Sequence, residues 1–464
     1  PADGAVHEAA PSGSLTKARV VRHRRVFPLV RLREKAANAF WLLPTLLLLG
    51  ALVLSAITHI LDGRFTATTP TSVALWSASA ATQVLSVLAT AMLSFLAVVF
   101  SITMVAMQLA SQQFSPRVLR TYVRSTTTKI ALGTFVAAFV YPLFALAYVE
   151  RTEGPGGSAP PTVTAFVASL LALASLILLI VYVSHTINLM RVAYAIRSVA
   201  QETRSALRAA VPPESAYMGV PEPILGEPLR VVRYRRPPWS LAATRASQGV
   251  IMGTDTVQLV RLASRDDCVI RTLVQVGDYV SEGAPVFEVH PRERARSSAV
   301  PGDDELLRTI DVGPERTVYQ DPSYGVRELV DVAVQALSPA VNAPTTAVQV
   351  IDRLEDILAQ VARRPDVSHL VADEDGTVRL VAGHRGWDDL VSLSLTEIQE
   401  FGAGSPQVTR RLFALLEHLL AVASEPRREA LLRQQASLAV AVAARVPEGA
   451  SRELAHTPDR RGLG

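Results

Sequence analysis

Four long apolar stretches occupy the first 190 residues of the chain, and none of them contains a charged side chain. They run over about residues 40–61, 82–110, 130–148 and 163–190. An α-helix needs about 20 apolar residues to cross a hydrocarbon core of about 30 Å. The sequence therefore predicts a membrane domain of four transmembrane helices over residues 40–190.

The second stretch is set apart by a regular series of polar side chains. Ser94, Ser101 and Gln108 repeat every seven residues, close to two helical turns, so they share one face of the helix. The full series is Ser86, Thr90, Ser94, Ser101, Gln108 and Gln112. Lipid does not solvate such groups, so we expect this polar stripe to face protein or water. It either packs against another helix or lines a pore built from several copies of this helix.

A basic segment follows the polar stripe. Ser115 and Pro116 are typical of a helix start, and Arg117, Arg120 and Arg124 then fall on one side of the new helix. This pattern indicates a helix at the membrane surface. Around a pore, these arginines would form a basic collar that favours anions at the inner mouth.

The distribution of Lys and Arg among the loops predicts how the chain is oriented in the membrane. The segment before the first stretch holds eight Lys and Arg residues, whereas loops 62–81 and 149–162 hold one arginine each, Arg64 and Arg151. The positive-inside rule then places both termini in the cytoplasm of a multi-pass plasma-membrane protein. We interpret the basic N-terminal segment, residues 1–39, as lying on the membrane surface; binding to nucleic acid is not expected.

One ionisable side chain lies deep in a predicted span. His185 is close in sequence to Tyr182 and Asn188, so the three form a possible intramembrane polar site. Proton- and sodium-coupled transporters usually carry Asp, Glu, Lys or Arg near the bilayer midplane, and the predicted spans hold none. The alternatives for His185 are an interfacial histidine with its hydrogen bonds made, or a proton relay.

The rest of the chain predicts a cytoplasmic α+β domain. Residues 191–240 form a helical extension and a proline-rich connector, 241–300 a small β-rich subdomain, and 301–464 a mainly helical part. Residues 276–289 resemble the turn and strands of biotinyl and lipoyl carriers, which suggests a small β-barrel or sandwich. A carrier role is excluded because no lysine follows Lys129.

Two stretches resemble the signature segments of a family of predicted bacterial membrane proteins, the domain of unknown function 2254. They are FSITMVAMQLASQQFSPRVLRTYVRS over residues 100–125 and DPSYGVRELVDVAVQALSPAVNAPTTAVQVIDRL over residues 321–354. The resemblance covers about residues 19–446 and implies the same four-span layout with a cytoplasmic domain. It implies no activity. In the second stretch the family usually has Asp where this chain has Ala343.

This second stretch also contains a candidate contact site in the cytoplasmic domain. Arg327 and Asp331 are one helical turn apart and can form an ion pair, and Asn342 lies in a turn between two prolines. Either this is a rigid corner between two helices, or it is a contact for a ligand or another subunit.

Enzyme signatures are missing from the sequence. It has no phosphate-binding loop, no HExxH and no GxSxG, and its single cysteine, Cys268, excludes an intramolecular disulfide or a cysteine-based metal cage. We therefore predict no catalytic residues, no metal and no cofactor. The leading hypothesis is a homo-oligomer in the lipid bilayer that passes small ions or anions along the second span. The alternative is a membrane-anchored binding or regulatory module.

Overall fold

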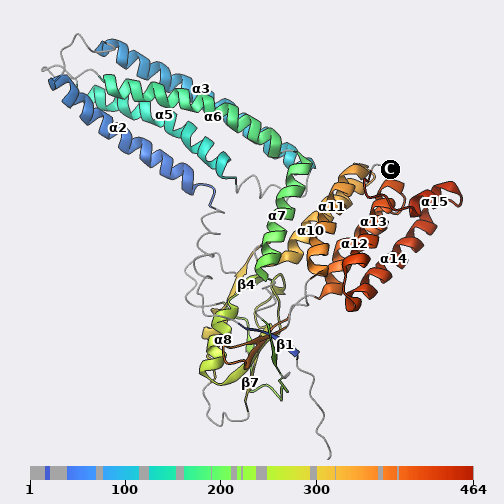
Figure 1. Cartoon of the computed structure of the whole chain (residues 1–464). Coiled ribbons are helices and arrows are strands. Elements are labelled where there is room, and N and C mark those ends of the chain that lie inside the picture. The colour runs from blue at the N-terminus through green and yellow to red at the C-terminus, as the bar shows by residue number, and fades with distance from the viewer. Residues whose placement is uncertain are drawn as a thin grey trace, which may run out of the picture. The chain divides into compact units, whose positions relative to one another are not determined.

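The computed structural model describes residues 16–20, 39–68, 77–113, 125–152, 161–189, 191–210, 217–220, 223–236, 248–292, 300–318, 320–363, 369–383 and 386–462 of the 464-residue chain (Figure 1). The chain divides into two compact units. The membrane unit is Pro28–Ala195. The sheet-and-helix unit combines Pro1–Phe27 with Ile196–Gly464.

The membrane unit contains four helices that are long and apolar enough to cross a bilayer, as predicted. They are α2 (Leu42–Thr68), α3 (Ala78–Gln113), α5 (Thr126–Thr152) and α6 (Thr162–Leu189). Three of them, α2, α3 and α5, run several residues beyond the predicted limits of their spans. As a result, Asp62 lies in α2 and Lys129 lies in α5, although the sequence places both in the flanking loops.

Helix α5 is the packing centre of the membrane unit. Half of its candidate span is buried, compared with 17–22% for the other three, and it packs against α2, α3 and α6. Small side chains permit this close approach. A Cβ atom at Gly133 of α5 would lie 2.6 Å from the Leu47 side chain and 2.9 Å from the Pro44 backbone of α2. Only glycine fits this contact.

A carboxylate on α2 caps the first turn of α6. Asp62 is 2% exposed, and its oxygens accept hydrogen bonds from the backbone N–H groups of Val163 (2.7 Å) and Thr164 (3.2 Å). The N-terminal N–H groups of a helix have no partner within the helix, and the helix dipole favours a negative charge there. This contact explains how a buried carboxylate is tolerated at the end of a span.

The sheet-and-helix unit contains two open sheets. The first has seven strands in the order β2-β1-β9-β10-β5-β7-β3, and the second has three in the order β6-β4-β8. The strands are β1 (Thr16–Val20), β2 (Tyr217–Val220), β3 (Arg230–Arg233), β4 (Gly249–Thr254), β5 (Cys268–Thr272), β6 (Tyr279–Val280), β7 (Pro285–Pro291), β8 (Ile310–Gly313), β9 (Leu370–Ala372) and β10 (Val378–Val381). A small β region was predicted; the described strands do not close into a barrel.

The sequence did not predict which strands make up the first sheet. Strand β1 comes from the N-terminal segment that we interpreted as lying on the membrane surface, and it pairs antiparallel with β2 and parallel with β9. Strands β9 and β10 form a hairpin, and β10 pairs with β5 from the other side of residue 300. The sheet therefore cuts across the predicted boundary between the β-rich and helical subdomains.

The remaining helices belong mainly to the C-terminal part of this unit, as predicted. They are α7 (Val192–Ala210, from Ile196 on within this unit), α8 (Thr256–Arg265), α9 (Asp303–Leu307), α10 (Pro322–Leu337), α11 (Pro344–Ala362), α12 (Trp387–Gly402), α13 (Pro406–Val422), α14 (Glu425–Arg445) and α15 (Ala450–His456). Three of them start at Pro322, Pro344 or Pro406, because proline fits the first helical turn without losing a hydrogen bond.

We expect the substitution Asp62→Ala to destabilise the membrane unit by about 1–2 kcal/mol, the usual effect of removing a helix cap. Asp62→Asn should have a smaller effect because it keeps one acceptor oxygen. Thermal unfolding in detergent, followed by circular dichroism, measures the change. The control is Ile60→Ala, since Ile60 lies on the same helix and is 59% exposed. Equal melting temperatures for Asp62→Ala and Ile60→Ala would contradict the capping role.

Candidate functional site

The polar stripe of α3 lies on the surface of the membrane unit. Its described side chains, Ser86, Thr90, Ser94, Ser101 and Gln108, are all exposed. The opposite face of α3 is buried and consists of Ala81, Leu85, Ala89, Val99, Thr103 and Ala106. Among the described residues of one chain, the stripe therefore lies on the exposed side of α3 and is not covered by another helix. Gln112 belongs to α3, but its side chain and the predicted collar Arg117, Arg120 and Arg124 lie outside the described residues.

Two hydroxyls of the stripe are satisfied by their own helix. Thr90 Oγ1 donates to the carbonyl of Ser86 (3.1 Å), and Ser94 Oγ donates to the carbonyl of Thr90 (3.4 Å). This bonding to the preceding turn is common for Ser and Thr in membrane helices. Ser101 and Gln108 make no side-chain hydrogen bond with any residue that the structure describes.

The outward faces of α2 and α6 have a different composition. On α2 the exposed large side chains include Leu42, Leu46, Leu49, Val53, Ile57 and Ile60. On α6 they include Leu170, Leu173, Leu176, Ile177, Ile180 and Val181. Both surfaces are mainly aliphatic, as expected for contact with lipid chains. Helix α6 also exposes Phe166 and, near its C-terminal end, Ser184 and Asn188. The outward face of α3 is the one that combines apolar side chains with a line of hydroxyl and amide groups.

The structure does not bring the three residues of the predicted intramembrane site, Tyr182, His185 and Asn188, together. Tyr182 is fully buried, and its hydroxyl lies 2.5 Å from that of Thr103 on α3. His185 is half-buried, with Nε2 at 2.7 Å from the hydroxyl of Ser125. Asn188 is exposed. Tyr182 and His185 thus contact different partners, and the three side chains do not converge on one point.

Three further buried polar side chains lie in the same part of α5 and α6. Thr128 and Lys129 are in the first turn of α5 and are 0% and 5% exposed, while Thr186 on α6 is 4% exposed. The hydroxyls of Thr128 and Thr186 have no hydrogen-bond partner in the described structure. Thr128 and Lys129 lie just before the predicted third span, which starts at Ile130, so the apolar pattern alone does not identify them as buried.

Helices α3 and α6 lie side by side (Figure 1) and enclose a groove of about 290 Å³ on the surface of the membrane unit. Its lining residues are Ser101, Ile102, Val105, Ala106, Val183, Thr186 and Ile187. The groove begins at Ser101 and is therefore continuous with the polar stripe.

In the sheet-and-helix unit, Arg327 joins two helices. Its Nε donates to Asp331 Oδ1 on α10 (2.7 Å), the ion pair that their spacing allows, and Nη2 donates to Glu397 Oε2 on α12 (2.7 Å). The guanidinium lowers the pKa of Glu397. Glu397 could not be found from sequence, because no local pattern links positions 327 and 397.

The structure does not bring Asn342 to Arg327. Asn342 is exposed in the turn after α10 and has a φ of +45°. Arg327 lies ten residues before the end of α10, which at 1.5 Å per residue is about 15 Å away along the helix. Asn342 serves the turn, since asparagine tolerates the left-handed conformation better than most residues.

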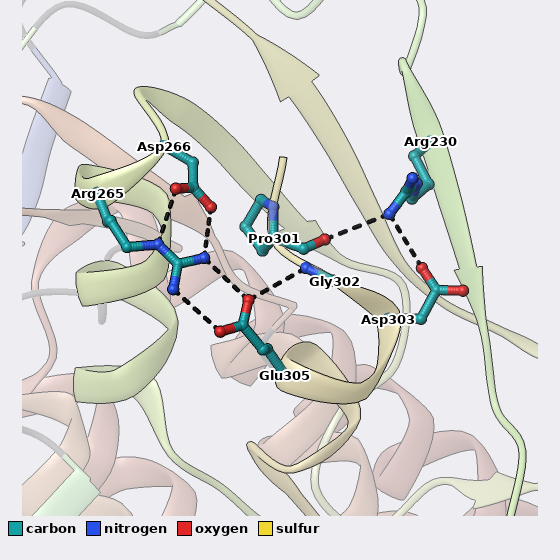
Figure 2. Close-up of polar contacts among 7 residues, drawn as sticks. All are labelled: Arg230, Arg265, Asp266, Pro301, Gly302, Asp303 and Glu305. Atoms are coloured by element: carbon teal, nitrogen blue, oxygen red, sulfur yellow. Dashed lines mark hydrogen bonds and ion pairs between the residues drawn. The ribbon is translucent and has the colours of Figure 1, made fainter. Parts of the chain in front are cut away.

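A second ionic cluster joins α8 to α9 (Figure 2). Arg265 donates two hydrogen bonds to Glu305, from Nη1 to Oε1 (3.0 Å) and from Nη2 to Oε2 (2.9 Å), and it also contacts Asp266. The guanidinium holds the pKa of Glu305 at about 2, against a usual value of 4.5. Nearby, Arg230 contacts Asp303 and the Pro301 carbonyl. The cluster combines two arginines with three carboxylates, and each arginine is paired with at least one of these acids.

The single cysteine of the chain, Cys268, is buried in the core of the sheet-and-helix unit. Burial raises the pKa of the Cys268 thiol to about 11, so this cysteine is protonated at neutral pH. The described residues contain no group of three His, Cys, Asp or Glu side chains placed to hold a metal.

We expect the stability provided by Glu305 to depend on pH. Its folded pKa lies below its unfolded value, so the stabilisation is complete above pH 4.5 and disappears as the pH falls towards 2. Because the side chain is 43% exposed, solvent screening limits the effect to about 1 kcal/mol. Urea unfolding in detergent should show Glu305→Gln less stable than wild type at pH 6 and equal to it near pH 2. The control Glu282→Gln changes an exposed acid. A constant difference between wild type and Glu305→Gln across this range would refute the prediction.

Comparisons with known proteins agree with this architecture. The chain is 27% identical over 380 residues to Uncharacterized protein Rv1290c of Mycobacterium tuberculosis (strain ATCC 25618 / H37Rv), which covers 81% of this chain and 69% of that protein. Uncharacterized protein Mb1321c of Mycobacterium bovis (strain ATCC BAA-935 / AF2122/97) matches with the same identity and coverage. No solved structure matches. The model of the family described as Predicted membrane protein (DUF2254) matches residues 37–418, so the chain belongs to this family, as its two signature-like stretches predict.

Proposed function

We propose that the chain is the subunit of a homo-oligomeric plasma-membrane protein in which copies of α3 surround a polar path for small ions. Both termini then lie in the cytoplasm. The observation that carries the proposal is the position of the polar stripe: it is exposed on the far side of α3 from the face that packs within the chain. In a single chain, these polar groups would face lipid.

The length of the stripe fits a path across the bilayer. From Ser86 to Gln108 the helix rises 22 residues, or about 33 Å at 1.5 Å per residue. The hydrocarbon core is about 30 Å thick. The hydroxyls and the amide therefore follow one another across the whole apolar region, instead of forming a single polar contact.

The contrast with α2 and α6 supports neighbouring copies of α3 as the partners of the stripe. These two helices expose aliphatic faces, which lipid chains solvate as well as protein does. Ser101 and Gln108 gain hydrogen bonds only from other polar groups, and a ring of α3 helices supplies those groups along with any enclosed water. A ring also explains why one helix of four departs from the aliphatic pattern.

The permeating species is inferred from charge. The path proposed here has no acidic side chain, because none occurs between Gln83 and Phe114. Hydroxyls and amides serve both cations and anions, but the arginines at 117, 120 and 124 follow at its inner end in the sequence. A positive inner mouth raises the local concentration of anions, so we favour small anions.

The second candidate is a membrane-anchored binding or regulatory module. The sheet-and-helix unit, which includes Ile196–Gly464, is the larger of the two units and has its own hydrophobic core. In this case the four helices serve for anchoring, and a ligand or partner of the sheet-and-helix unit determines the activity.

Flux measurements separate the two functions. We expect purified oligomers in liposomes to pass chloride faster than protein-free liposomes. The double substitution Ser101→Leu/Gln108→Leu should reduce flux to the protein-free level, because it replaces the polar line with aliphatic groups. The control Val87→Leu/Val98→Leu changes two exposed residues of α3 outside the stripe and should retain flux. Native mass spectrometry verifies that every variant has the same subunit number.

Two results would contradict the proposal. A monomeric wild-type chain would remove the ring, and an intact oligomer without chloride or potassium flux, with and without a membrane potential, would favour the anchored module. Equal loss of flux in both double variants would indicate general damage to α3 and would remove the polar stripe from the argument.

A further inference from the structure

We propose that neighbouring subunits join through α3 and the groove beside it, so that Met104 of one subunit enters the groove between α3 and α6 of the next. This inference rests on the homo-oligomer proposed above and specifies its interface. The occupant of the groove is a second copy of this chain.

The two flanks have complementary shapes. At 100° per residue, Leu93, Phe100 and Met104 fall together on one side of the stripe, and they are 54%, 48% and 70% exposed. The other side of the stripe leads through Ser101 and Val105 into the groove. One flank therefore projects large flexible or aromatic side chains, and the other is hollow.

This arrangement is what a ring requires. A ring of identical subunits uses a heterologous interface, in which two different surfaces of the same chain meet. If the stripe of each subunit faces the axis, its projecting flank points to one neighbour and its hollow flank to the other. A two-fold dimer with the stripe on its axis would also set a projecting flank against a hollow flank, but it closes at two subunits, so crosslinking through this contact would stop at the dimer.

Met104 and the groove also lie at the same depth in the membrane. Rotation about an axis normal to the membrane leaves every residue at its own depth, so a side chain can enter only a groove at the same depth. The groove is lined on α3 by residues 101–106, and Met104 lies within this range. Phe100 lies one residue before this range in the sequence, and Leu93 lies about two helical turns before Phe100. Met104 is therefore the projecting residue placed to enter the groove.

The groove also contains a polar group that lacks a partner. Thr186 lines it, is 4% exposed, and has a hydroxyl without a hydrogen bond among the described residues. A methionine thioether is a weak acceptor and fits irregular apolar spaces. The remaining lining side chains are aliphatic apart from Ser101, so they suit the Met104 methylene and methyl groups.

Disulfide crosslinking in the full chain tests this contact. In a Cys268→Ser background, which removes the single native cysteine, we combine Met104→Cys with Val183→Cys and oxidise membranes with copper phenanthroline. Each subunit then links to the next, and a non-reducing gel should show a ladder of dimers, trimers and larger products. The control pairs Met104→Cys with Val181→Cys, since Val181 is 48% exposed at nearly the same depth but on the other flank of α6.

Two gel results would overturn the interface. One is a ladder no stronger than that of the control pair. The other is a strong dimer from Met104→Cys alone, which would indicate a two-fold contact between projecting flanks. The crosslinking result is independent of ion flux. A ladder from oligomers that pass no ions would refute conduction and support the interface. Flux without a ladder would support conduction and refute the interface.

A second pair of variants covers the case in which the cysteine chains misfold. Ile187→Trp narrows the groove, and Ile177→Trp makes the same change on the outer side of α6; the two isoleucines are 59% and 58% exposed. We expect Ile187→Trp to weaken subunit association about tenfold. Overpacking a contact costs roughly 1.4 kcal/mol of association free energy, which corresponds to this factor. Ile177→Trp should leave association unchanged. Native mass spectrometry at decreasing protein concentration measures both. Equal association constants would overturn the proposal.

Discussion

Hydrocarbon offers no hydrogen-bond partner, so every polar group in the membrane unit depends on the protein for one. Several side chains find it between helices. The Tyr182 hydroxyl meets that of Thr103, and the Tyr141 hydroxyl lies 2.8 Å from that of Thr58. Asp62 accepts two backbone N–H groups at the start of α6. These contacts join α2, α3, α5 and α6 at defined positions and leave aliphatic surfaces elsewhere.

The outward face of α3 is where this rule is met least completely. Thr90 and Ser94 turn back to their own helix, but Ser101 and Gln108 do not. The same helix borders a groove that contains the unpartnered hydroxyl of Thr186. Both features lie on the surface that a ring of subunits would cover, so a single physical requirement, partners for polar groups at depth, leads to the proposed path and to the proposed interface.

In the sheet-and-helix unit, charged contacts join segments that are distant in sequence. Arg327 connects α10 to α12, and Arg265 connects α8 to α9. In both cases an arginine meets a carboxylate through well-aligned hydrogen bonds, a geometry that fixes orientation as well as distance. The acids involved are kept ionised by their partners, which makes them positioning groups and leaves them poorly suited to proton transfer near neutral pH.

The sequence by itself determined the four spans, the helical C-terminal part and the family, because length, hydropathy, proline-initiated helices and signature stretches are local properties. It also located the polar stripe on α3. The tertiary structure decided which way the stripe faces, which groups share the groove, and which partners Asp62 and Arg327 find. The pairing of β1 with β9 likewise joins residues some 350 positions apart. Periodicity could not supply these answers: lipid chains are as apolar as a protein core, so an apolar helix face in a membrane protein does not reveal whether protein or lipid covers it.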